Sequence, residues 1–222
     1  MKHIHRPLRY FSAATCLSAL LTAYTAAQPP SGLIAYAGAG MIDAATTVLD
    51  GGANVNEKDA NSGDTPLMRA ARNGRSEMVL FLLQRGADAK ATNSRGETAL
   101  TSFGGSCISP DAAKALVAGA GNPKEEMHTA LLRSAGALGQ QVSCLSLVKF
   151  FVENGADPNY QDGFGNTALI SASRWGHREV VRFLLTKGAD PSLKTKDGHT
   201  ALDEAANGEI WRMLRDAKRE QQ

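Results

Sequence analysis

The side chains of this sequence that could do chemistry are a few histidines and cysteines, and they are widely spaced. His128, His177 and His199 show no pairing four residues apart, and no Cys-x-x-Cys accompanies them, so the ligand spacing typical of a zinc site is missing. The run 104–107 (Gly-Gly-Ser-Cys) resembles a nucleophile turn, but it lacks the Gly-x-Ser-x-Gly pattern. No phosphate-binding loop is present. The sequence therefore predicts a protein that is not an enzyme and that uses neither a metal nor a cofactor.

The distribution of charge argues against a nucleic-acid-binding protein. The chain has 222 residues, 24 basic and 22 acidic, with a formal net charge of +2. Residues 1–27 hold Lys2, Arg6 and Arg9 and no acidic residue, so the remainder is close to neutral. A protein that displaces counterions from phosphates needs a basic stripe. We therefore expect a protein partner rather than a nucleic acid.

The first 27 residues have the order of a secretory signal peptide. A basic start is followed by a charge-free run at 11–24 and by small residues at 25–27. A disordered tail is the alternative, because the run contains several Ser and Thr residues. The run is too short and too polar to span about 30 Å of hydrocarbon. We expect cleavage after Ala27, a linker at 28–32, and a periplasmic or secreted mature protein without a membrane contact.

An internal repeat with a period of about 33 residues organises the rest of the chain. Gly-Ala pairs recur with gaps of 34, 33, 36 and 33 residues, beginning at Gly52, Gly86, Gly119, Gly155 and Gly188. A second motif, Gly-x-Thr-[Pro/Ala]-Leu, recurs beginning at Gly63, Gly96, Gly165 and Gly198. A degenerate copy, Thr-Ala-Leu, stands at 129–131. Such self-similarity is typical of a solenoid, whose repeats are stable only when stacked.

These motifs resemble the ankyrin repeat over residues 33–217, with the closest match at 162–190. The resemblance implies an all-α solenoid of stacked helix-turn-helix units joined by short β-hairpin loops, about six units including the caps. We number these repeats one to six, with the expected bounds 33–56, 57–90, 91–123, 124–159, 160–192 and 193–217. A polar tail is expected at 218–222. The His that follows Thr-Pro-Leu in the family is missing from every repeat.

The residues agree with such helix pairs. In each repeat the Thr of the second motif is expected to cap a first helix, and Pro66 suits the first helical position. The second helices carry apolar residues at helical spacing and are followed by Gly at 86, 155 and 188, which suits a left-handed C-cap. The last helix, 209–222, is expected to turn Ile210, Trp211 and Leu214 inward as a C-terminal cap.

The fourth repeat departs from this regularity. Five extra residues lie between its two helices, within 136–143, and the connection before it, 121–128, is short and lacks the hairpin turn. Cys107 and Cys144 precede the second helices of adjacent repeats. Export with cleavage after Ala27 would remove Cys16 and leave two cysteines. An even number of cysteines in an oxidising compartment favours a disulfide, whereas in the cytosol they would be free thiols. We predict a Cys107–Cys144 bridge, because the extra residues within 136–143 allow the loop that carries Cys144 to reach Cys107.

The resemblance further implies that a partner is bound by the hairpin tips and the exposed face of the first helices. Phe164, Arg174 and Trp175 are expected to form an exposed cluster, since aromatic and Arg side chains are enriched in interface hot spots. Packing of Trp175 over a neighbouring repeat is the alternative. The candidate protein-binding residues are Arg72, Asn73, Arg95, Glu97, Phe164, Asn166, Arg174, Trp175 and His199.

A protein-binding scaffold, acting as a monomer on one partner protein, is the function these features favour. The chain resembles small exported bacterial ankyrin-repeat proteins, some of which look like immunity proteins that block a delivered toxin. Others resemble proteins that support a periplasmic catalase in peroxide defence. A secreted effector that acts on a host protein is a third possibility.

Overall fold

The computed structural model describes residues 32–102, 107–136 and 144–220. The contacts of the chain divide it into two units, residues 1–31 and 32–222. All described residues belong to the second unit, so the predicted signal peptide at 1–27 lies outside them.

The described residues form ten α-helices, and no named strand occurs among them. A single bridge between Lys194 and Thr200 is the only strand pairing in this part of the chain. The helices are α2 (Leu33–Ala39), α3 (Ile42–Asp50), α4 (Pro66–Arg72), α5 (Ser76–Gln84), α6 (Pro110–Ala120), α7 (Lys124–Ala135), α8 (Leu145–Glu153), α9 (Ala168–Arg174), α10 (Arg178–Thr186) and α11 (Gly208–Glu220).

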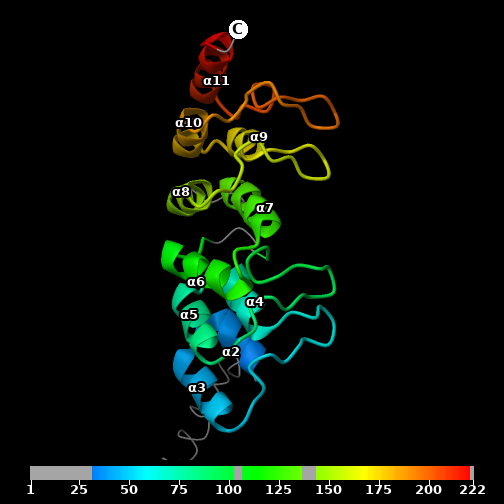
Figure 1. Ribbon diagram of the computed structural model, residues 1–222, viewed down its shortest axis with the longest axis vertical. Coiled ribbons are helices and arrows are strands. Elements are labelled where there is room, and N and C mark those ends of the chain that lie inside the picture. Colours follow the sequence, from blue (N-terminus) through cyan, green and yellow to red (C-terminus); the bar gives the residue numbers. More distant parts are fainter. Residues whose placement is uncertain (1–31, 103–106, 137–143, 221–222) are drawn as a thin grey trace, which may run out of the picture. The chain divides into compact units, whose positions relative to one another are not determined.

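The helices pack as pairs, and the pairs pack on one another in chain order. The first helices of neighbouring repeats form one row, in which α2 contacts α4 and α7 contacts α9. Second helices contact along the other, from α5 through α6, α8 and α10 to α11. Figure 1 shows long loops leaving the first-helix side in a common direction. The predicted all-α solenoid is confirmed.

The capping residues act as predicted in the most regular repeats. The hydroxyl of Thr65 accepts a hydrogen bond from the Met68 N–H at 3.3 Å, and Pro66 follows as the first residue of α4. Thr167 caps α9 in the same way at 3.1 Å. Gly86 has φ 84°, a left-handed conformation that disfavours any residue with a Cβ. Local sequence therefore sets the bounds of these helix pairs.

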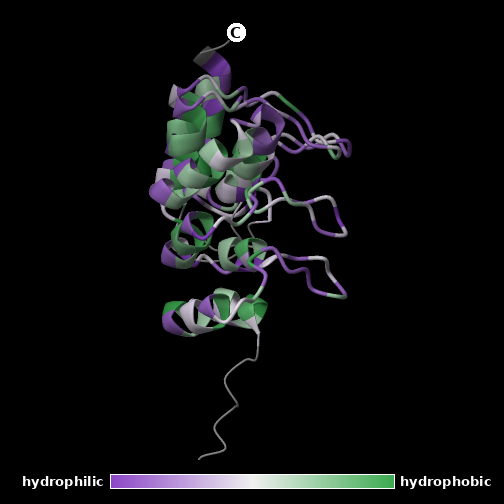
Figure 2. Ribbon diagram, turned by 60° about the horizontal axis from the view of Figure 1, so that its bottom comes forward, coloured by the Kyte–Doolittle hydropathy of each residue, from purple (hydrophilic) through white to green (hydrophobic). Residues whose placement is uncertain are grey.

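The core is a continuous apolar layer between the two rows of helices. Leu82 of α5, Leu147 and Phe151 of α8 and Leu184 of α10, all on second helices, are almost completely buried. Figure 2 shows the hydrophobic residues gathered on the helices and the hydrophilic ones on the projecting loops. Because each repeat covers its neighbour's apolar face, stability comes from stacking rather than from any one repeat.

The expectation that every repeat has a Thr-capped first helix is wrong for three repeats. Thr98 and Thr200 precede turns rather than helices, and the Thr98 N–H donates to the Thr101 hydroxyl at 2.9 Å. Thr129 lies inside α7, which begins after Pro123. With no hairpin to complete, the short connection lets α7 start earlier, and acidic residues in its first turn suit the helix dipole.

The C-terminal helix also differs from the prediction. Ile210 and Leu214, four residues apart, are buried on one face. Trp211 is 42% exposed, because a one-residue step turns it off that face, and the Arg215 guanidinium lies 5.1 Å from its ring centroid. The helix continues to Glu220, through most of the tail expected at 218–222.

Candidate protein-binding surface

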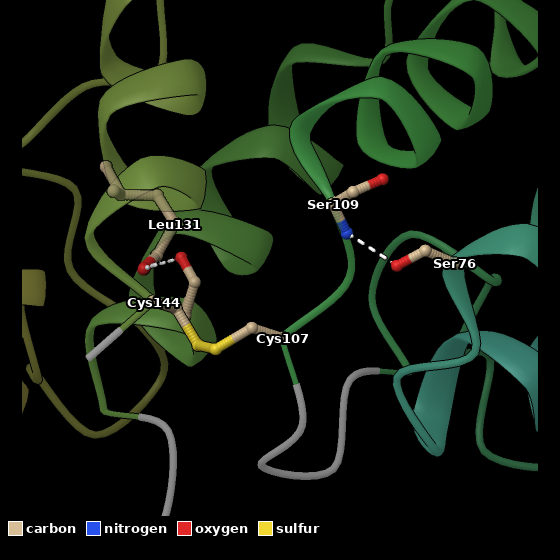
Figure 3. Close-up of a disulfide and its surroundings, with 6 residues drawn as sticks. Ser76, Cys107, Ser109, Leu131 and Cys144 are labelled. Atoms are coloured by element: carbon tan, nitrogen blue, oxygen red, sulfur yellow. Dashed lines mark hydrogen bonds between the residues drawn. A yellow bond between two sulfur atoms is a disulfide. The ribbon is translucent and has the colours of Figure 1, made fainter. Parts of the chain in front are cut away.

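The structure contains the predicted Cys107–Cys144 disulfide, which joins repeats three and four (Figure 3). Cys107 precedes α6 and Cys144 is the N-cap residue of α8, with their Cα atoms 5.6 Å apart. Near Cys107, the Ser109 N–H donates to the Ser76 hydroxyl at 2.7 Å and fixes this segment to α5. The expected insertion at 136–143 lies outside the described residues except for Gly136. The bridge therefore ties second helices together on the side away from the hairpins.

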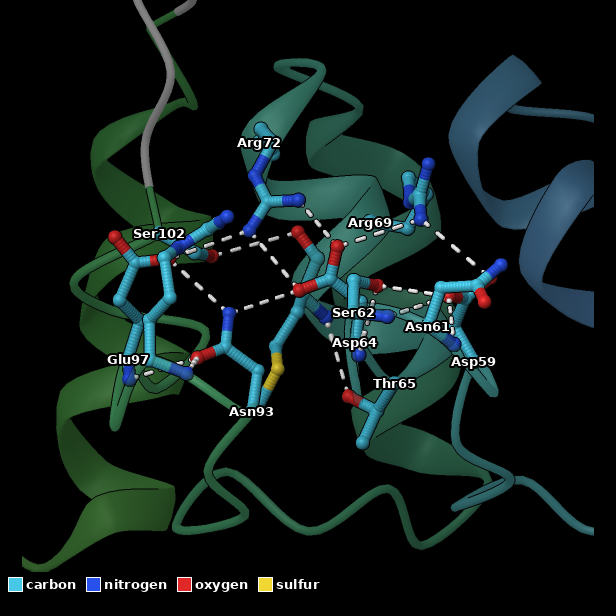
Figure 4. Close-up of polar contacts among 12 residues, drawn as sticks. Asp59, Asn61, Ser62, Asp64, Thr65, Arg69, Arg72, Asn93, Glu97 and Ser102 are labelled. Carbon is cyan, nitrogen blue, oxygen red and sulfur yellow. Dashed lines mark hydrogen bonds and ion pairs between the residues drawn. The ribbon is translucent and has the colours of Figure 1, made fainter.

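A buried carboxylate, Asp64, holds the first helix of repeat two against the hairpin of repeat three (Figure 4). Its side chain is 0% exposed. Both terminal nitrogens of Arg72 donate to it, and the Asn93 amide donates to it at 2.9 Å. Burial raises the pKa of Asp64, but the hydrogen bonds from Arg72 and Asn93 outweigh burial and lower it. The carboxylate is therefore satisfied and charged.

Glu97 occupies the equivalent position one repeat later and binds three guanidinium groups, of which Figure 4 labels that of Arg72. Its oxygens lie 2.7 Å from an Arg95 nitrogen, 2.9 Å from one of Arg133 and 3.4 Å from one of Arg72. Burial raises the pKa of Glu97, but hydrogen bonds from Arg95, Asn93 and Arg133 bring it down to about 2. Because Arg133 belongs to α7, this cluster connects repeats two, three and four.

The four N-terminal candidates are thus largely engaged within the solenoid. Arg72 and Glu97 contact each other and Asp64 or Arg133. The Asn73 amide donates to the Gly38 carbonyl of repeat one at 2.9 Å. Arg95, whose side chain is 60% exposed, and Asn73 are the exposed residues of the four. Among these candidates, Arg95 and Asn73 offer surface to a partner.

The C-terminal candidates lie at two separate places. The Glu204 carboxylate lies 2.9 Å from an Arg174 nitrogen and 3.0 Å from a His199 ring nitrogen. These hydrogen bonds lower the pKa of Glu204. Phe164, 73% exposed, lies at a hairpin tip before α9, whereas Trp175, 43% exposed, follows the end of α9.

Seven helical residues span about 10 Å. Phe164 and Trp175 therefore flank opposite ends of α9 rather than forming one compact cluster. The Asn166 side chain donates to the Asp162 carboxylate and shapes the same hairpin.

An open groove of about 390 Å³ lies where repeat four lacks a hairpin. Its walls are the hairpin of repeat three and Tyr160 of repeat five, and its floor is α7. Charged and polar side chains line it, including Glu97, Thr98, Glu125, Glu126, Arg133 and Tyr160. Sequence reasoning located the irregular connection at 121–128 but named only Glu97 of these residues. The degenerate Thr-Ala-Leu copy at 129–131 was the available signal.

No group of three His, Cys, Asp or Glu residues in 32–102, 107–136 and 144–220 is placed to hold a metal ion. No helix in the same part of the chain is long and apolar enough to cross a membrane.

Comparisons with known proteins agree on the repeat. Residues 51–101 match a model of ankyrin repeats (many copies), and residues 137–221 match a model of ankyrin repeats (3 copies). An ankyrin repeat and KH domain-containing protein of Caenorhabditis briggsae is 31% identical over 140 residues, which are 60% of this chain and 5% of that protein. An ankyrin repeat, SAM and basic leucine zipper domain-containing protein of Loxodonta africana is 34% identical over 142 residues. These residues are 64% of this chain and 23% of that protein. The chain thus spans less than a quarter of these relatives.

A solved bacterial structure resembles nearly the whole chain. It is a predatory endopeptidase from Bdellovibrio bacteriovorus in complex with an immunity protein. The matching chain of that complex is 27% identical, with a TM-score of 0.66. The match covers 85% of this chain and 99% of that one. Unlike the curated relatives, this neighbour is therefore matched along its full length.

Proposed function

This chain belongs to the ankyrin-repeat family, and from that premise we propose that it is an immunity-type inhibitor that binds one protein partner and occludes it. Ankyrin repeats serve protein–protein interaction, so the general role is binding another protein. The finer proposal is that the partner is a toxic hydrolase in the periplasm and that this chain acts on it as a monomer.

The solved neighbour carries this proposal. It is an immunity protein bound to an endopeptidase, and the likeness to this chain extends over 99% of its length. The resemblance extends over almost all of that chain, whereas the curated relatives share only a part of their length with this one. The exposed hairpin residues of this chain, Arg95, Phe164 and His199, supply the polar and aromatic groups that such an interface uses.

The disulfide supports the periplasmic part of the proposal. Disulfides persist in oxidising compartments and are rare in the cytosol. Cys144 is 3% exposed and Cys107 is half-buried, so the bridge is partly shielded from solvent. The signal-like order of residues 1–27 agrees with export.

The test is capture followed by inhibition. Residues 28–222 are immobilised and used to recover a partner from periplasmic extract. The Phe164→Ala/Arg95→Ala variant, which lacks two exposed hairpin side chains, is tested in parallel. We expect a hydrolase that loses activity at a stoichiometric amount of the chain, and weaker capture by the variant. Recovery of a catalase whose activity rises would favour the peroxide-defence alternative. A captured hydrolase that stays active when saturated would refute inhibition.

A further inference from the structure

The hairpin loops, which we call fingers, are coupled to one another by a repeated backbone hydrogen bond. The fingers comprise residues 57–65, 91–98, 160–167 and 193–200. The Ser94 N–H donates to the Ser62 carbonyl at 3.0 Å, and the Lys196 N–H donates to the Phe164 carbonyl at 2.9 Å. In both pairs the donor stands two residues before a turn glycine, and the acceptor one residue before the previous finger's glycine. The fingers therefore form a ladder with a fixed register.

This ladder is interrupted at repeat four. Residues 121–123 lead directly into α7, so no finger lies between those of repeats three and five (Figure 1). The same register assigns a missing finger two partners, the Arg95 carbonyl as acceptor and the Gly163 N–H as donor. Neither group has a hydrogen bond to another described residue. The gap thus presents one unused acceptor and one unused donor on its opposite walls, like the exposed edges of a sheet.

The floor of the gap carries uncompensated negative charge. The Glu125 side chain is 86% exposed, and its nearest basic group is His128 at 4.0 Å. Glu126 accepts a hydrogen bond from the neutral Thr98 hydroxyl at 2.5 Å. Arg133, the cation on the floor, is paired with Glu97. A segment that enters the gap therefore meets two acidic side chains, Glu125 and Glu126. Neither forms an ion pair with a Lys or Arg among the residues that the structure describes.

We propose that a turn of the partner protein, carrying Lys or Arg at its tip, docks in this gap in place of the missing finger. Its backbone accepts from Gly163 and donates to Arg95, as neighbouring fingers do, and its cation faces Glu125 and Glu126. Such backbone pairing at an open edge is a general mode of peptide recognition. This inference rests on the proposed function and names the site and chemistry of the contact.

The probe is a cyclic peptide that copies residues 159–167 of this chain, with F164K placing Lys at the tip; its control carries F164E. Each is titrated into the isotope-labelled chain, residues 28–222, and followed by NMR. We expect the largest shift at the Gly163 amide, together with slower hydrogen exchange there. The F164K peptide should bind about tenfold more tightly than F164E, because the change replaces attraction by repulsion at the acidic floor.

Glu125→Gln should reduce that preference severalfold, whereas Glu153→Gln, an exposed change at the end of α8, should leave it unaltered. Absence of a Gly163 shift at millimolar peptide, or equal affinity for the two peptides, would overturn the inference. Capture and inhibition of a hydrolase would then still stand, because that experiment does not depend on the peptide. Failure of both would remove the proposed function as well.

Discussion

Replacing Glu97 by Gln should destabilise the protein at neutral pH and lose that effect in acid. The carboxylate neutralises Arg72, Arg95 and Arg133 across three repeats, and its side chain is only 15% exposed. Gln keeps the size and an acceptor but removes the charge. The effect of the substitution therefore measures the charge rather than the packing.

The magnitude follows from the pKa of Glu97, lowered from 4.5 to about 2. A carboxyl with a depressed folded-state pKa contributes stability that is present above its unfolded pKa and is lost as pH falls through the folded pKa. At ~1.36 kcal/mol per pKa unit, the contribution at pH 7 is about 3 kcal/mol. The same linkage leaves roughly 1.4 kcal/mol at pH 3 and almost none below pH 2.

Urea unfolding of the wild type and Glu97→Gln, followed by circular dichroism at pH 7, 5 and 3 with the disulfide intact, measures this difference. Glu153→Gln is the matched control, because Glu153 is exposed and has no charged partner among the described residues. We expect the control to change the free energy of unfolding by less than about 0.5 kcal/mol. A Glu97→Gln cost that is equally large at pH 3 and pH 7 would refute the electrostatic reasoning.

Three further changes test other parts of the structure. Cys107→Ser with Cys144→Ser, which opens a loop with a sequence separation of 37, should cost roughly 4 kcal/mol by the chain-entropy model, and dithiothreitol should lower the stability of the wild type alone. Thr65→Ala should cost about 1 kcal/mol of unfolding free energy through loss of its cap, whereas Thr129→Ala inside α7 should be near neutral; equal costs would contradict the helix bounds. Phe164→Ala should leave the melting temperature within about 2 °C while weakening partner binding, and a large drop in melting temperature would make Phe164 a packing residue.

The regular repeats could be predicted from the sequence because their signals are local. A capping Thr and a glycine with positive φ act within one turn of the helix they bound, as Thr65 and Gly86 do. The same Thr signal failed at Thr98 and Thr129, where the chain before or after it is not that of a regular repeat. Trp211 was misplaced because a helical step of one residue separates a buried from an exposed face.

The candidate site was less predictable because it arises between repeats. The pairings of Asp64 and Glu97 with guanidinium groups join residues up to 36 positions apart, and nothing local to either acid indicates them. The period nevertheless contained a usable signal. Both acids follow the turn glycine of their finger, so stacking brings them side by side, and Asn93 donates to both. Aligning equivalent positions of successive repeats would have predicted this row.

The breaks in repeat four belong to one structural arrangement. Loss of a finger removes a rung of the backbone ladder, yet side-chain ties still hold repeats three and four together. The Cys107–Cys144 bridge joins them along the second helices, and the Glu97–Arg133 ion pair joins them along the first. The ion pair lines the groove and the bridge lies among the second helices, so together they hold repeats three and four in register while leaving the groove open. A rigid frame around an unfilled position lowers the entropy lost when a guest turn binds, which is the physical reason to look for the partner contact there.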